Sequence, residues 1–189
     1  MRSTASDTSN SSLVSSLSLV PLRALKPPHA EEPMMTPCQL ETSSDAPPIV
    51  GPYYYDLQVP IGETDSYGVA WHGSYTRWLE EARVAMLWAL GVSLEEDTLL
   101  YPVKHLSLTY HQPIRALQWI RIEVRLQKEG LKLVFRYKVF DLSQPHTPES
   151  AVHCEGLCHI VPVEKSSWRP SRHLSEPLHG LLTLGKQPS

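Results

Sequence analysis

Asp65, Gly68 and His72 stand at short intervals in the middle of the chain, and their types suit chemistry. A carboxylate such as Asp65 can act as a nucleophile or as a general base. Gly68 lets the backbone turn tightly or admits a substrate close to it. An isolated Asp-x-x-Gly pattern is also common by chance, and Asp65 could simply form an Asx turn. The interpretation of this pattern therefore depends on the secondary-structure elements around it.

A long helix is expected directly after this loop. Apolar side chains recur at spacings of three and four from Tyr75 to Leu90, and the residues between them are mostly polar. Ser74 can cap the start of the helix, and Gly91 stands where a left-handed residue would end it. We expect one amphipathic helix of about 16 residues. Ser93 and Glu96 then make a capping box for a short helical turn.

Strands are expected on both sides of the helix. Apolar and polar residues alternate with period two in the second half of the chain, and Lys128-Glu129-Gly130 forms a short hairpin turn. The expected strands are residues 53–60, 103–111, 120–126, 133–139 and 151–163. A helix that is apolar on one broad face must lie across such an antiparallel sheet, which predicts an α+β fold.

With these elements in place, the segment from Gln58 to Tyr75 resembles the 4-hydroxybenzoyl-CoA thioesterase family of hotdog proteins, including the bacterial branch associated with the Tol-Pal system. The shared features are Thr64-Asp65, Gly68-Val69, His72, Tyr75 and, along the helix, Glu80-Glu81-Ala82-Arg83. A weaker resemblance extends from Tyr53 to Pro177 and includes Tyr110-His111-Gln112-Pro113. It implies a hotdog fold, with one long central helix wrapped by a curved antiparallel sheet of about five strands.

The resemblance also implies an activity. In the enzymes that this chain resembles, the carboxylate at the Asp65 position attacks a thioester or activates a water molecule. The backbone amide at the His72 position polarises the thioester carbonyl, as suits a helix N-terminus with its unpaired amides and positive dipole end. The expected reaction is hydrolysis of an acyl-CoA, or of an acyl-carrier-protein thioester, without a cofactor. The resemblance further implies a homodimer or homotetramer with active sites between subunits.

Other residues are candidates with open alternatives. The candidate substrate-binding residues are Tyr67, Gly68, Val69, Trp71 and Tyr75. Ordinary packing of an aromatic loop is the alternative for Tyr67, Val69 and Trp71. Glu80 is a possible secondary carboxylate, but its spacing also suits an ion pair with Arg83. The His72 ring is expected at a surface or interface.

The chain departs from the family pattern at several positions. Ser74 stands where many relatives have asparagine, Ala70 where valine is frequent, and Gln118-Trp119 where a Gly-Asp turn is common. These departures affect the substrate and any CoA contact more than the carboxylate or the amide. Lys104 and Arg115 are possible phosphate partners on charge grounds, with solvated surface as the alternative.

Two rival functions keep the same fold. One is a noncatalytic acyl-CoA-binding protein, and the other is a hotdog hydratase or dehydratase with a histidine and a carboxylate as acid and base. His153, Cys154, Cys158 and His159 suggest a metal site, but in a strand the two cysteines would lie about 13 Å apart. No metal site is therefore predicted. The chain has no Gly-x-Ser-x-Gly elbow and no Walker-type loop.

Composition limits the partners and the compartment. The 17 Lys+Arg against 20 Asp+Glu, a net charge of -3, provide no broad cationic field, so nucleic acid is not an expected partner. No apolar stretch approaches the roughly 20 residues that cross a bilayer. The three cysteines match no disulfide framework, which favours a reducing compartment. We expect the cytoplasm, or a plastid if the source is a plant or alga.

The two ends of the chain differ from its middle. Residues 1–50 are rich in Ser, Thr and Pro and are expected to be disordered. A transit peptide, a plain flexible extension and an early start codon remain open for this segment. We expect the folded domain at residues 51–178 and a C-terminal tail at residues 179–189.

Overall fold

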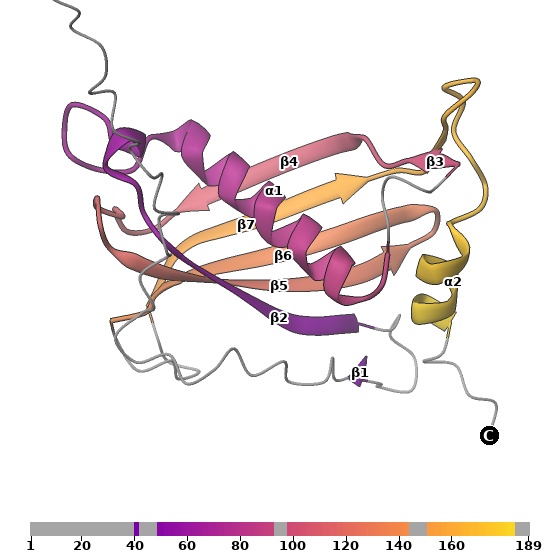
Figure 1. The fold of residues 1–189 in the computed structure, drawn as a ribbon, viewed down its shortest axis with the longest axis horizontal. Helices are drawn as coiled ribbons and strands as arrows, with labels where there is room; N and C mark the ends of the chain where they lie inside the picture. The colour runs from indigo at the N-terminus through magenta and orange to yellow at the C-terminus, as the bar shows by residue number, and fades with distance from the viewer. Residues whose placement is uncertain (1–39, 42–48, 93–97, 144–150, 184–189) are drawn as a thin grey trace, which may run out of the picture. The chain divides into compact units, whose positions relative to one another are not determined.

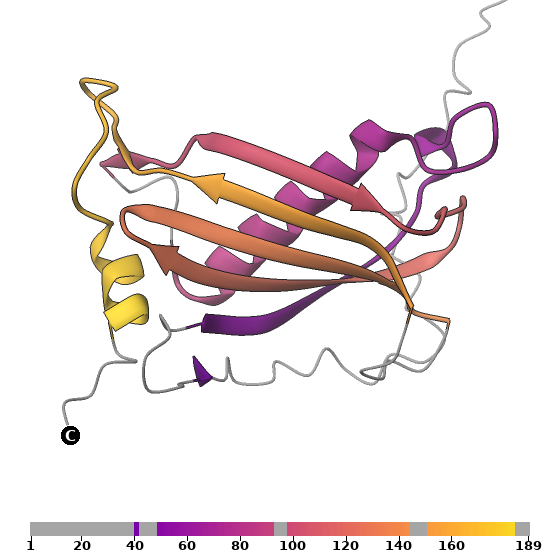
Figure 2. The ribbon, with the colours of Figure 1, turned by 180° about the vertical axis from the view of Figure 1, so that it is seen from behind.

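A twisted antiparallel sheet and one long helix make up most of the computed structural model, which describes residues 40–41, 49–92, 98–143 and 151–183. The sheet has the strand order β1-β2-β5-β6-β7-β4. Its strands are β1 (Leu40–Glu41), β2 (Ile49–Gln58), β4 (Val103–Tyr110), β5 (Trp119–Glu129), β6 (Lys132–Asp141) and β7 (Val152–Ile160). Helix α1 (His72–Ala89) crosses one face of the five long strands (Figure 1), and Figure 2 shows the face without the helix. This is the hotdog arrangement expected above.

Hydrophobic alternation determines which face of the sheet packs on α1. In β5 the side chains from Ile120 to Leu126 alternate between fully buried and half-buried. The half-buried side chains on the opposite face include Arg121, which forms two hydrogen bonds of 2.8 Å with Asp56 of β2. The expected hairpin joins β5 to β6, with Gly130 at a φ of 62° in its turn.

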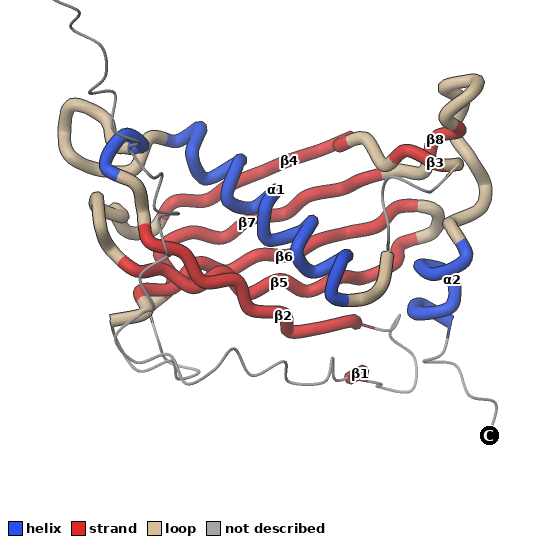
Figure 3. The backbone as a smooth tube through the Cα atoms, in the orientation of Figure 1, coloured by secondary structure: helices blue, strands red, loops and turns tan. Residues whose placement is uncertain are grey.

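Helix α1 packs closely on the middle of the sheet (Figure 3). Trp78, Leu79 and Met86 are buried, and each buried side chain of this size contributes about 1.5–3 kcal/mol of hydrophobic stabilisation. Gly156 of β7 lies directly beneath the helix, where an added Cβ would stand 2.8 Å from Leu79 Cδ1. A residue without a side chain at position 156 therefore permits the close approach of α1 to β7.

The two ends of α1 differ from each other in how they are capped. The prediction that Ser74 caps the start is wrong, because the helix begins at His72 and Ser74 is a buried residue of its first turn. At the other end the amide of Gly91 donates to the Trp88 carbonyl at 2.9 Å, and the amide of Val92 donates to the Leu87 carbonyl at 2.9 Å. Gly91 has a φ of 77°, so the expected left-handed C-terminal residue is confirmed as part of a Schellman motif.

The chain continues beyond the main sheet with elements that were not expected. Strands β3 (Leu99–Leu100) and β8 (Val163–Glu164) form a two-stranded ribbon. Helix α2 (Glu176–Thr183) follows and extends past residue 178, where the domain was expected to end. Leu178 and Leu182, one turn apart on α2, are buried in the same hydrophobic core as α1. Neither helix within the described residues is long and apolar enough to cross a membrane.

The expected N-terminal boundary also differs from the observed elements. Strand β2 begins at Ile49 and strand β1 occupies Leu40–Glu41, both before residue 51. The rest of the segment expected to be disordered, residues 1–39 and 42–48, lies outside the described residues. The short helical turn expected at Ser93 to Glu96 also lies outside them.

Candidate functional site

The loop before α1 is a tight turn closed by backbone hydrogen bonds. It follows a short 3-10 helix, η1 (Ile61–Glu63). The amide of Asp65 donates to the Val69 carbonyl at 2.8 Å, and the amide of Gly68 donates to the Asp65 carbonyl at 3.0 Å. Gly68 has a φ of 72°, a conformation that side chains disfavour. The glycine at position 68 therefore allows the chain to reverse and enter the helix.

The carboxylate of Asp65 has one oxygen in the turn. Its Oδ1 accepts the amide of Tyr67 at 2.8 Å and the amide of Val69 at 3.4 Å, which is the Asx turn considered above. Among the hydrogen bonds within the described residues, none involves Oδ2. The turn therefore fixes the orientation of the carboxylate and leaves one oxygen for another partner.

A cavity of about 340 Å³ lies between this loop, the first turn of α1 and the segment after β4. It is lined by Asp65, Val69, Ala70, His72, Tyr75, Tyr110, His111, Gln112 and Pro113. The structure thus brings Asp65, Val69, His72 and Tyr75 together around one space. The segment at residues 110–113 was noted in the sequence but was assigned no role.

The first amides of α1 lack hydrogen-bond acceptors within the described residues. His72 is the first residue of the helix, and no hydrogen bond within the described residues has the His72 or Gly73 amide as its donor. The first amides of a helix lack intrahelical acceptors and carry the positive end of the helix dipole. The hydroxyl of Tyr110 donates to the His72 carbonyl at 3.4 Å. The site therefore combines a carboxylate with unpaired helix amides.

Two tyrosines form a wall of this cavity. The rings of Tyr75 and Tyr110 meet edge to face with centroids 4.9 Å apart. Burial is the main cause that raises the pKa of Tyr75 to about 12, so its hydroxyl is neutral at physiological pH. Burial likewise raises the pKa of the nearby Cys154 thiol to about 12, which makes Cys154 a poor nucleophile there.

The remaining expected substrate contacts are placed differently. Tyr67 is 86% exposed, and neither Tyr67 nor Gly68 lines the cavity. Trp71 is 52% exposed and lines a second cavity of about 430 Å³ on the other side of Asp65. The Trp71 indole lies over Gly73, where an added Cβ would stand 2.0 Å from the ring. Tyr67 and Trp71 therefore do not line the cavity at Asp65 and His72.

Glu80 lines neither of the two cavities beside Asp65. It forms the ion pair with Arg83 that its spacing suggested. Arg83 is buried, donates to Cys158 Sγ at 3.2 Å and lies over the Phe135 ring at 5.8 Å. These contacts give Glu80 a structural partner.

The other polar candidates are not among the residues that line the cavity at Asp65. The side chains of Lys104 and Arg115 are exposed and do not line the cavity at Asp65. Cys154 and Cys158 are both buried in β7. Within the part of the chain that the structure describes, no group of three or more His, Cys, Asp or Glu residues could hold a metal ion.

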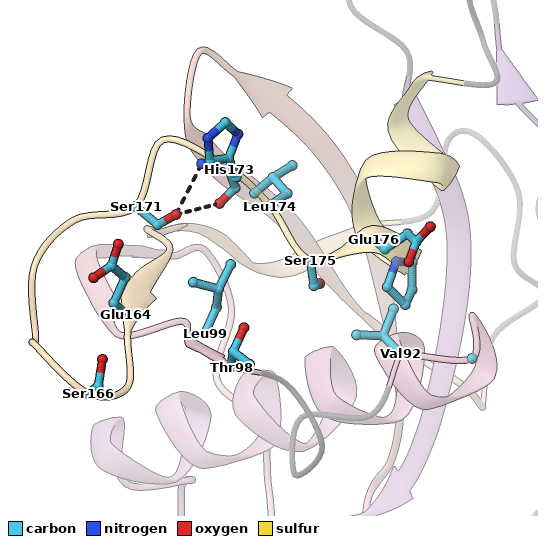
Figure 4. A pocket seen from close by; sticks show the side chains of 12 residues that line it. Val92, Thr98, Leu99, Glu164, Ser166, Ser171, His173, Leu174, Ser175 and Glu176 are labelled. Atoms are coloured by element: carbon cyan, nitrogen blue, oxygen red, sulfur yellow. Dashed lines mark hydrogen bonds between the residues drawn. The ribbon is translucent and has the colours of Figure 1, made fainter.

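Another cavity adjoins the opposite end of α1. It has a volume of about 700 Å³, and Figure 4 shows its polar lining of hydroxyl and carboxylate groups. These groups belong to Thr98, Ser166, Ser171, Ser175, Glu164 and Glu176. The Ser171 hydroxyl donates to the His173 carbonyl and accepts the His173 amide, both at 3.1 Å. No sequence motif marked this region as a site.

Comparisons with known proteins bear on this fold and site. Residues 67–145 match the family model described as the thioesterase superfamily. The chain is 44% identical over 75 residues to a Synechocystis sp. protein whose name describes it provisionally as an esterase. That match spans 38% of this chain and less than half, 45%, of the relative. The chain is also 26% identical over 126 residues to a 1,4-dihydroxy-2-naphthoyl-CoA hydrolase of Synechococcus elongatus, covering 64% of this chain and 90% of that protein.

A solved structure shows the same fold. The 1,4-dihydroxy-2-naphthoyl-CoA thioesterase from Synechocystis superposes with a TM-score of 0.62 at 16% identity, covering 70% of this chain and 96% of that one. The expected hotdog fold is thereby confirmed. The chain is a hotdog-fold protein related to the thioesterase superfamily.

Proposed function

We propose that this protein hydrolyses an acyl-CoA thioester to a free acid and CoA thiol. The observation that carries the proposal is that Asp65 and His72, the first residue of α1, line one cavity. The match to the thioesterase superfamily supports hydrolysis of a thioester as the reaction class. The closer kinship to 4-hydroxybenzoyl-CoA thioesterases, expected from the motif, is part of the same proposal.

In the proposed reaction the thioester carbonyl oxygen faces the amide at His72. Asp65 Oδ2 either attacks the carbonyl carbon or accepts a proton from a water molecule that attacks it. The negative charge that develops on the carbonyl oxygen is stabilised by the helix amide. The intermediate then expels CoA as a thiolate. Attack by Asp65 leaves an acyl–Asp65 anhydride that a water molecule hydrolyses, whereas attack by water forms the free acid directly with Asp65 holding the proton. In both routes a proton from the consumed water converts the thiolate to the thiol. Hydrolysis consumes one water molecule in either route.

The surroundings of Asp65 suit a preorganised site. The Asx turn holds the carboxylate through Oδ1, so ordering the side chain at each turnover costs little. Tyr75, Tyr110 and Val69 provide apolar surface for the acyl group. We further propose a homodimer or homotetramer in which a second subunit completes the cavity, as the resemblance implies. Acyl-carrier protein is the alternative carrier of the thioester.

A thiol-release assay on Asp65→Asn tests this proposal. Asparagine can keep the Asx turn but is neither a nucleophile nor a base, so hydrolysis should fall by about 10²–10⁴-fold. The matched control is Asp141→Asn, because Asp141 Oδ1 accepts the Ser143 amide at 2.8 Å in the same kind of turn and lines neither cavity beside Asp65. That control should hydrolyse at the wild-type rate.

The assay should cover aryl, short, medium and long acyl-CoAs, because neither the sequence nor the cavity identifies the acyl group of the substrate. Hydrolysis by folded Asp65→Asn at the wild-type rate would end the proposed mechanism. Tight binding of acyl-CoA by the wild-type protein, with no thiol released from any substrate, would instead favour the noncatalytic binding protein. Label found in Asp65 after turnover in ¹⁸O-labelled water would identify the anhydride route, because only an anhydride opened by water at the Asp65 carbonyl can leave label there.

A further inference from the structure

Glu63 connects the loop that carries Asp65 to the start of α1. Its carbonyl oxygen accepts the amide of Trp71 at 2.8 Å and the hydroxyl of Ser74 at 3.3 Å. Its side-chain oxygens bind the Trp78 indole, at 2.6 Å from Nε1, and the Arg77 guanidinium. A single residue therefore contacts the residue before α1 and the first two turns of the helix.

The side-chain contacts of Glu63 satisfy buried groups on both elements. Trp78 is 1% exposed, and a buried indole N–H without an acceptor costs free energy. The Glu63 side chain is itself only 15% exposed, so its charge needs the partners that Trp78 and Arg77 provide. The Glu63 contacts are therefore screened less by solvent than an ion pair between two fully exposed side chains.

The loop is also held by backbone contacts, among them the amide of Ala70 on the Ile114 carbonyl at 2.7 Å and a β-bridge between Val69 and Arg115. Ile61 and Tyr67, its large apolar side chains, are 67% and 86% exposed and so contribute little packing. Cavities of about 340 Å³ and 430 Å³ flank Asp65 on its two sides. The side chain of Glu63 adds to these backbone contacts a direct link from the loop to Arg77 and Trp78 of α1.

We infer that Glu63 is a positioning residue that sets the distance between the Asp65 carboxylate and the His72 amide. The inference rests on the proposed function, because it concerns the same site. Asp65 follows Glu63 by two residues, and His72 begins the helix to which the Glu63 side chain is bound through Arg77 and Trp78. The positions of the Asp65 carboxylate and of the His72 amide therefore both depend on Glu63. A misplacement of about 1 Å between reacting groups can cost about 10²-fold in rate.

The test compares Glu63→Ala and Glu63→Gln in the full chain. Glu63→Ala should lower kcat by about 10–100-fold and change KM by less than about threefold, because the substrate contacts remain while the reacting groups move apart. Glu63→Gln should recover most of this loss, because its amide oxygen still accepts the Trp78 N–H. Trp78→Phe removes the same hydrogen bond from the helix side and should also lower kcat.

Glu81→Ala is the matched control. Glu81 lies 3.8 Å from Arg77 Nε and accepts the Tyr55 hydroxyl at 3.4 Å, and no hydrogen bond or ion pair within the described residues joins it to the loop. Its replacement removes a partner of Arg77 without touching Asp65. We expect kcat within about twofold of wild type, as for an exposed helix pair of small energy.

Hydrogen exchange separates this inference from the proposed function. In Glu63→Ala the amides of Asp65, Gly68 and Trp71 should exchange faster than in the wild type, while the β5–β6 hairpin keeps its protection. Unchanged exchange there, or an unchanged kcat in Glu63→Ala when Asp65→Asn is inactive, would overturn the inference. If the wild type releases no thiol, the proposed function fails and exchange alone decides about Glu63. If Glu63→Ala does not fold, Glu63→Gln and Trp78→Phe provide the same comparison.

Discussion

The two ends of α1 each adjoin a cavity, and the smaller one carries the candidate chemistry. At the N-terminal end, Asp65 and His72 line about 340 Å³. At the C-terminal end, the cavity of about 700 Å³ is lined by hydroxyls and by Glu164 and Glu176 (Figure 4). Cavity volume alone would therefore favour the end of α1 that is not proposed for carbonyl chemistry.

Helix polarity explains the difference. The first amides of α1 are donors without intrahelical partners, which suits a developing oxyanion. At the other end the carbonyls of Leu87 and Trp88 are already used by the Schellman motif, and the dipole there is negative. An oxyanion is therefore stabilised at one end of the helix and destabilised at the other.

The two ends are also held in different ways. Polar contacts from Glu63 hold the loop at the N-terminal end. At the C-terminal end of α1, apolar packing is the main contribution, because Leu178 and Leu182 of α2 belong to the hydrophobic core there. The comparison predicts that changes near the C-terminal end affect stability, and that changes at the N-terminal end affect turnover.

The largest stability effect is expected for Leu178→Ala. Leu178 is fully buried, so the free energy of unfolding should fall by about 2–5 kcal/mol. Leu131→Ala, in the exposed turn of the β5–β6 hairpin, is the control and should change it by about 0.5 kcal/mol or less. Chemical denaturation measures both. The turnover of Leu178→Ala should fall only in proportion to its unfolded fraction. A larger loss of turnover would contradict the comparison between the two ends.

A smaller effect is expected where α1 ends. Gly91 has a φ of 77°, so Gly91→Ala should destabilise the protein by about 1–2 kcal/mol although no atom blocks the new Cβ. Gly180 lies within α2 with open space around it, and Gly180→Ala should stabilise the protein by about 0.5–1 kcal/mol. The two alanine variants should thus move the thermal midpoint in opposite directions. Equal shifts would contradict the role of Gly91 as a left-handed cap.

The last effect is absent at neutral pH and appears only in alkaline solutions. Burial raises the pKa of Tyr75 from 10.0 to about 12, so the unfolded chain releases this proton first. The contribution of Tyr75 to stability is therefore complete below pH 10 and is lost as the pH rises through 12. In Tyr75→Phe the free energy of unfolding should fall less steeply over this range than in the wild type. Tyr67→Phe, at an exposed position, is the control and should follow the wild-type profile.

The sequence predicted the elements that have a strong period and clear ends. Helix α1 and the β5–β6 hairpin were expected because their apolar residues recur regularly and because Gly91 and Gly130 mark their limits. Ser74 was expected as a cap from its type alone, but Trp71 precedes the helix and Ser74 bonds to Glu63. Residue type therefore did not reveal the tertiary contact that decides the role of Ser74.

Contacts between distant segments were the part that the sequence did not provide. Helix α2 is eight residues long and contains Pro177 and Gly180, so its periodic signal is weak, and tertiary burial of Leu178 supports it. The segment around Tyr110 reaches the Asp65 cavity only because β4 is placed at the sheet edge. Glu63 was missed because its partners lie 8 to 15 residues away along the chain.

The Asx turn at Asp65 has a consequence for how this position tolerates change. One carboxylate oxygen closes the turn and the proposed chemistry uses the other, so a single side chain meets a folding requirement and a chemical one. Lengthening it by one methylene, as in glutamate, keeps the charge but loses the short reach that closes an Asx turn. Only aspartate satisfies both requirements, so conservation of charge would be an insufficient criterion for recognising functional homologues at this position.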